Sequence, residues 1–199
     1  MNSPQPGVRT EVAHTYQDPL DLIWLNCAAQ VGMVIRRDNT VFAAWDGTGT
    51  LTLGTQETLD ADDCIAQMIL HELCHHLVEG PESWNRPDWG LQIDNPAQRS
   101  REHACLRLQA ALADTVGLRH FFAATTSFRT YYDALPDDTL KVGKDPAIQP
   151  AREGWTRSQT GPWASPIKAA LKATQQIAEL VDGMAPSSSI WAREQPRDV

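Results

Sequence analysis

Apolar side chains recur at helical spacing in five stretches of this chain, each of which is bounded by capping or helix-breaking residues. In the first stretch, for example, Asp18 can cap a helix that has Pro19 in its first turn, and Gly32 ends it. In the second, Thr58 or Asp60 can act as the cap. The five predicted helices cover residues 18–31, about 58–79, 97–116, 119–135 and 166–181.

Between the first two predicted helices lie three short segments of β-type pattern. They cover residues 33–36, 41–45 and 50–53, and Asp38-Asn39 and Asp46-Gly47 turns separate them. Turns of this length favour a small, mostly antiparallel three-stranded sheet. The pattern therefore predicts the α+β class, with the sheet packed on helices.

The remaining segments suggest how the chain is organised. Residues 1–17 are polar and contain prolines, which predicts a flexible N-terminal arm, and residues 18–135 form the expected core. Residues 136–163 are rich in proline and glycine and predict an extended wrapping segment. With the last helix it makes up a C-terminal extension, 136–199, that packs on the core.

Composition narrows the functional classes. The chain has 199 residues, a length that suits one main domain. Its net charge is −8 and it has no basic block, so we expect no nucleic-acid partner. No apolar run approaches the ~20 residues that span a bilayer, and the N-terminus lacks the pattern of a signal peptide, so we expect no membrane partner and a cytoplasmic location. The cysteines Cys27, Cys64, Cys74 and Cys105 form no Cys-x-x-Cys pair, and we expect mostly buried, reduced thiols.

The clearest chemical signal is His-Glu-x-x-His, at His71-Glu72-Leu73-Cys74-His75. On a helix, residues four apart lie on the same face, so His71 and His75 can direct their imidazoles to one ion. Glu72 is then close enough to contact a water molecule on that ion. Two histidine ligands and a neighbouring carboxylate base are typical of a catalytic zinc site with an open position for water.

A third zinc ligand has to come from another element, and the helix predicted over 97–116 offers two candidates. Glu102 shares the apolar face of that helix with Cys105 and Leu106, whereas His103 shares a more polar face with Arg107. Helical phase therefore favours Glu102 as the inward-pointing ligand. His103 and Cys105 remain alternatives, and His76, which follows the motif directly, is a further candidate.

The two segments together, His-Glu-Leu-Cys-His and the stretch from Arg101 to Leu112, resemble the ImmA/IrrE-type metallopeptidases, which are small gluzincins. The resemblance covers roughly residues 18–118. It implies a zincin-like fold, a zinc cofactor with His71, His75 and Glu102 as ligands, and Glu72 as general base. A more distant similarity to SprT-like proteases, which use a downstream histidine ligand, keeps His103 in consideration.

We therefore expect a zinc metallopeptidase that hydrolyses a peptide or amide bond in a specific intracellular protein or peptide. The strand at 50–53, if it lies at the sheet edge, could pair with an extended substrate. His120, Tyr131 or Tyr132 could stabilise the oxyanion, or could simply be core and surface side chains. The loop 81–90, with its two tryptophans, is either a wall of the site or an ordered surface loop. The alternative function is a zinc-stabilised regulatory or protein-binding module without protease activity.

Overall fold

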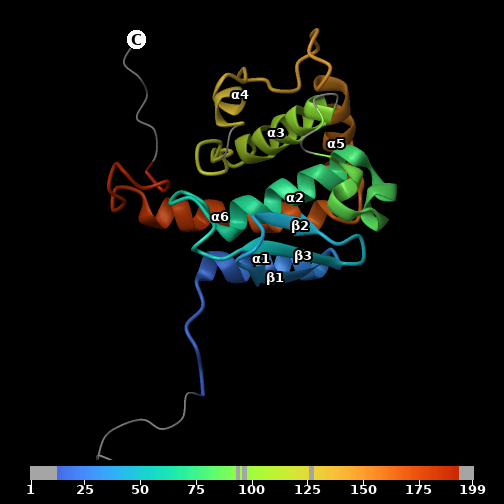
Figure 1. The fold of residues 1–199 in the computed structure, drawn as a ribbon. Helices are drawn as coiled ribbons and strands as arrows, with labels where there is room; N and C mark the ends of the chain where they lie inside the picture. Colours follow the sequence, from blue (N-terminus) through green and yellow to red (C-terminus); the bar gives the residue numbers. More distant parts are fainter. Residues whose placement is uncertain (1–12, 93–94, 96–97, 126–127, 193–199) are drawn as a thin grey trace, which may run out of the picture.

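The computed structural model describes residues 13–92, 95, 98–125 and 128–192. Much of the predicted N-terminal arm thus lies outside the described residues. In the described part, the chain folds into six α-helices, two short 3-10 helices and a three-stranded sheet (Figure 1). The elements are α1 (Pro19–Gln30), β1 (Val34–Asp38), β2 (Ala43–Trp45), β3 (Thr50–Gly54), α2 (Ile65–Glu79), η1 (Pro81–Asn85), η2 (Pro87–Gly90), α3 (Arg99–Asp114), α4 (Arg129–Asp133), α5 (Ile148–Thr160) and α6 (Ala164–Val181).

The α+β class and the three strands are confirmed, but the sheet is mixed and not mostly antiparallel. Its strand order is β1-β3-β2, with β1 parallel and β2 antiparallel to β3. The Asp46-Gly47 turn makes the expected hairpin of β2 and β3. The segment that leaves β1 carries the chain past the position of β3, so β3 fills the centre of the sheet and the two earlier strands become its edges.

Helix α2 lies at the centre of the molecule. In Figure 1 it runs between the sheet and α3, and it also contacts α1, α5 and both 3-10 helices. Most of its side chains are buried, including those of Ile69, Leu70, Leu73 and Leu77. Its first residue is Ile65, later than expected, because Asp63 accepts a hydrogen bond from the Asp60 backbone and forms a turn there. Cys64 replaces Thr58 or Asp60 as the N-cap, and its N–H donates to Gln67.

Two predictions about the later chain were wrong. Among the described residues of 119–135, only the short α4 is an α-helix, because the Phe121 and Phe122 carbonyls accept hydrogen bonds from the side chains of Gln67 and Gln109, which lie on other helices. Within the stretch predicted to be extended, 136–163, residues Ile148–Thr160 form α5. Pro150 is tolerated in the first turn of α5, where backbone N–H groups have no intrahelical partner.

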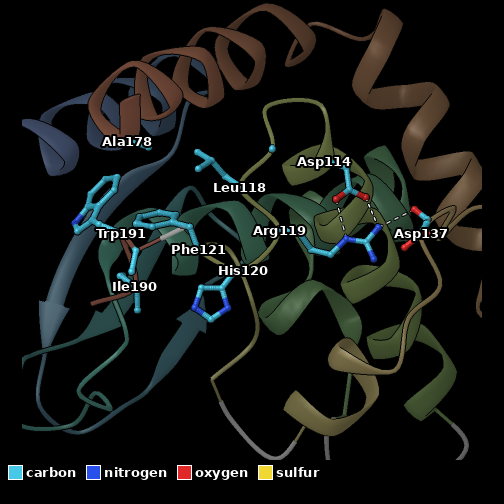
Figure 2. A pocket seen from close by; sticks show the side chains of 11 residues that line it. Asp114, Leu118, Arg119, His120, Phe121, Asp137, Ala178, Ile190 and Trp191 are labelled. Atoms are coloured by element: carbon cyan, nitrogen blue, oxygen red, sulfur yellow. Dashed lines mark hydrogen bonds and ion pairs between the residues drawn. The ribbon is translucent and has the colours of Figure 1, made fainter. Parts of the chain in front are cut away.

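The C-terminal third packs on the rest of the molecule. Helix α5 contacts α2 and α3, and α6 contacts α1. Side chains of both helices, including Ala151 and Ile167, belong to the same buried cluster as Trp24 and Leu73. Figure 2 shows Trp191 of the last described segment beside Phe121, with ring centroids 4.5 Å apart. None of the helices in the described ranges has the length and apolarity that crossing a bilayer requires.

Candidate metal centre

The His-Glu-x-x-His sequence lies in the middle of α2, where its two histidines are one helical turn apart. The Nε2 atoms of His71 and His75 are 3.0 Å apart, with the rings nearly perpendicular. The i, i+4 spacing predicts this juxtaposition. The His75 side chain is buried, and that of His71 is partly open to solvent.

Helix α3 brings Glu102 to the same point. Its Oε1 lies 3.4 Å from His71 Nε2 and its Oε2 lies 3.3 Å from His75 Nε2. Ligand atoms around a tetrahedral zinc ion, each about 2.0–2.1 Å from the metal, are roughly 3.3 Å from one another. The two nitrogens and the carboxylate thus have the mutual spacing that such an ion requires.

The charges around this point favour a cation. Burial lowers the pKa of His75, but the negative charges of Glu102, Glu72 and Glu79 outweigh this effect and raise it to about 9. Burial raises the pKa of Glu102, but the two neighbouring histidines outweigh burial and lower this pKa to about 2. Near neutral pH, Glu102 is therefore ionised and His75 is protonated, so the acidic side chains stabilise a positive charge at this point.

Gln109 fixes the tautomer of His71. Its side-chain Nε2 donates to the Phe122 carbonyl at 2.6 Å, so its oxygen faces His71 Nδ1 at 2.8 Å. The proton of neutral His71 is then on Nδ1, and the Nε2 lone pair points towards His75 and Glu102. By contrast, His75 Nδ1 is buried without a hydrogen-bond partner among the described residues.

Sequence reasoning missed Gln109, although a signal was available. It lies seven residues after Glu102, two turns along the same apolar face of α3. A polar amide on a buried helical face needs a hydrogen-bond partner. Its position in line with a predicted ligand could have marked it as a neighbour of the candidate metal site.

Cys105 offers an alternative third ligand. His71, His75 and Cys105 have ligand atoms within 4.8 Å of one another and could hold a metal ion. However, the Cys105 sulfur approaches His71 Nδ1, at 3.6 Å, and that nitrogen is already bonded to Gln109. Burial and the neighbouring Cys74 also raise the pKa of the Cys105 thiol well above its ordinary value. The geometry favours Glu102, whose carboxylate faces Nε2 of both histidines.

Glu72 lines a cavity next to this group. The cavity has a volume of about 280 Å³ and is lined by both polar and apolar side chains. One oxygen of Glu72, Oε2, accepts a hydrogen bond of 2.7 Å from the indole N–H of Trp89, in the loop after α2. The lining residues are Phe42, Ala43, Asp63, Gln67, Met68, His71, Glu72, His75, Glu102, Gln109, Ala123, Ala124, Thr125 and Phe128.

His103, Tyr131 and His76 are not among the residues that line this cavity. The ring of His103 stacks on Tyr131 with centroids 3.6 Å apart, and the Tyr131 hydroxyl is bonded to Arg107 and Asp145. His76 faces Ser83 and Trp163.

Neither of the remaining oxyanion candidates lines the cavity either. The Tyr132 hydroxyl donates to the Arg119 carbonyl, and His120 lines a different hollow beside Arg119 and Trp191 (Figure 2). The structure therefore brings Glu102 to the histidines of α2, and it does not bring His103, His76, Tyr131, Tyr132 or His120 there.

Comparisons with protein-family models, with curated proteins and with solved structures found no match for this chain. Its function therefore has to be argued from the site itself.

Proposed function

We propose that this protein is a zinc-dependent metallopeptidase with a zincin-like fold, related to the ImmA/IrrE type. The observation that carries the proposal is the convergence of His71 Nε2, His75 Nε2 and the Glu102 carboxylate at 3.0–3.4 Å, beside a cavity that Glu72 lines. A helix, three strands, the histidine helix and the glutamate helix follow one another in the order that the resemblance implies. We place the activity in the cytoplasm, where its four thiols would remain reduced.

His71, His75 and Glu102 would hold the ion, and Glu72 would act on the substrate water. A bound zinc ion supplies a Lewis acid that lowers the pKa of a water molecule to about 7 and stabilises developing negative charge on a carbonyl oxygen. Glu72 accepts a proton from the attacking water and returns it to the leaving amine. One hydrogen bond from Trp89 occupies only part of the accepting capacity of its carboxylate.

The edge strand β2 supports a peptide as the substrate. Phe42 O and Asp46 N bond to β3, so the N–H and C=O groups of Ala43, between them, point away from the sheet. Phe42 and Ala43 also line the cavity. An extended peptide could therefore pair with β2, which takes the role expected of β3, and could place an apolar side chain against Met68 and Phe128.

The second candidate function is a zinc-stabilised protein-binding module. The observation in its favour is the hydrogen bond from Trp89, through which the chain itself engages the proposed base. In that case the metal would order α2 and α3, and no turnover would occur.

Zinc content and peptide cleavage, measured together, distinguish the two functions. We expect the wild type to bind about one zinc per chain and to cleave members of a peptide library. Glu72→Gln should retain zinc but lose cleavage by at least ~100-fold, because the general base is gone. Glu102→Ala should lose most of its zinc, whereas His103→Ala should keep it, since His103 faces away from the site.

Two results would overturn these assignments. Full activity of Glu72→Gln would exclude Glu72 as the base, and undiminished zinc in Glu102→Ala would exclude Glu102 as a ligand. Zinc binding by a wild type that cleaves no library peptide would favour the binding module.

A further inference from the structure

Trp89, in the loop after α2, contacts the proposed general base, Glu72. Among the described residues outside α2 and α3, it is the one whose side chain donates a hydrogen bond to Glu72. Its indole is buried, and its N–H donates to Glu72 Oε2 at 2.7 Å. The bond has a neutral donor and a carboxylate acceptor, and such charge-assisted bonds are stronger than neutral ones. Burial also keeps water from replacing it.

The backbone that carries Trp89 is held in an unusual conformation. Asp88 and Trp89 have φ values of 47° and 58°, in the left-handed region that side chains other than glycine rarely adopt. Such a conformation persists where surrounding contacts impose it. Here the Asp88 carboxylate accepts a hydrogen bond from the Trp45 N–H at 3.1 Å, so the turn is attached to the end of β2.

Trp45 is the platform on which Trp89 rests. The two rings are stacked, with centroids 4.4 Å apart and planes 6° from parallel. Trp45 itself is buried and fixed, since its indole N–H donates to the Trp84 carbonyl at 2.9 Å. This chain of contacts ties the carboxylate of Glu72 to β2, the strand whose first residue, Ala43, lines the cavity.

We propose that Trp89 is a positioning residue for Glu72. By holding Oε2, it sets the rotation of the carboxylate and directs the second oxygen towards the cavity, at a set distance from the β2 edge. This role rests on the proposed function, because a held base matters only where Glu72 takes a proton. Nothing in it requires Trp89 to touch the substrate or the metal.

The test uses Trp89→Phe. This substitution removes the N–H donor, keeps an aromatic ring stacked on Trp45, and leaves a non-glycine residue at the position with positive φ. The matched control is Trp84→Phe, which makes the same change in a neighbouring ring of the cluster. The indole N–H resonances of the seven tryptophans are recorded by ¹⁵N NMR on the whole protein. The resonance lost in Trp89→Phe identifies Trp89, and this resonance should move upfield in Glu72→Ala, where the carboxylate acceptor is absent.

For cleavage of a library peptide, we expect Trp89→Phe to lower kcat about 10- to 100-fold with KM within about two-fold, because a misplaced base affects the chemical step. Its zinc content should equal that of the wild type, and Trp84→Phe should keep kcat within about two-fold.

The proposal is wrong if the Trp89 resonance does not respond to Glu72→Ala, or if both tryptophan variants have the same kcat. If the wild type cleaves no peptide, the proposed function fails separately. The resonance then still decides whether Trp89 holds Glu72.

Discussion

At the scale of single residues, the proposed ligands depend on neighbours that never touch the ion. The Gln109 side chain accepts a hydrogen bond from His71 Nδ1 and donates one to the Phe122 carbonyl. The bond to Phe122 fixes the orientation of the Gln109 amide, and the amide in turn orients the His71 ring. Such supporting hydrogen bonds hold an imidazole in the right tautomer and rotation for metal binding. A ligand's environment is therefore part of the site.

Gln109→Ala should weaken zinc binding about 10- to 100-fold, since His71 would lose the partner that fixes its tautomer. Competition with a chelator of known affinity measures the change. Gln149→Ala, at an exposed position of α5, is the control and should bind zinc as the wild type does. Equal affinities in the two variants would show that Gln109 does not support His71.

At the scale of elements, α3 and α5 are among the helices that hold α2 in place. Gly154 allows α5 to approach closely, because a Cβ atom there would lie 2.8 Å from Leu108 Cδ2 and 3.3 Å from the Leu77 carbonyl carbon. Arg157, one turn later, donates to the Leu77 carbonyl at the end of α2. The helix that the sequence pattern failed to predict thus fixes the end of α2, which carries the candidate metal ligands.

Gly154→Val should destabilise the protein by about 1–3 kcal/mol, because the added side chain overpacks the junction of α2, α3 and α5. The free energy of unfolding in urea measures this cost. Gln159→Val, which introduces the same residue at an exposed position of α5, should cost less than about 1 kcal/mol. A loss of equal size in both variants would point to helix propensity and not to packing.

At the scale of the whole molecule, a polar network ties the segment before α5 to α3. Arg107 donates to Asp145, to the Tyr131 hydroxyl and to the Thr139 carbonyl, each at 2.7 Å. Partial burial raises the pKa of Asp145, but hydrogen bonds from the Ala147 N–H, Arg107 and Tyr131 outweigh it and leave the pKa below its ordinary value.

Asp145→Asn should therefore be less stable than the wild type by about 1–2 kcal/mol at pH 7, where the wild-type carboxylate is charged. A lowered pKa in the folded state adds stability above the unfolded value near 3.8, and this stability is lost as the pH falls through the folded value. The difference between the two proteins should shrink below about pH 4. Unfolding in urea at pH 7 and pH 3 measures it, and a constant difference would contradict the role of the charge.

Local pattern determined much of the chain near the site. Helical spacing predicted that His71 and His75 share one face of a helix. The phase of the next long helix predicted that Glu102 points inward and His103 outward. The turn residues predicted three strands. These features depend on residues a few positions apart, so the sequence alone contains them.

Contacts between distant residues decided the rest. The pairing of β1 with β3, the helix over 148–160, and the hydrogen bonds of Gln109 and Trp89 join segments that local periodicity treats separately. Which strand pairs with which, and which group bonds to a buried amide, depends on the groups that the fold brings within hydrogen-bonding distance. The sequence by itself determined which side chains could hold an ion and accept a proton, whereas only the tertiary structure decided that they meet, because their approach depends on packing between α2, α3 and the loop after α2.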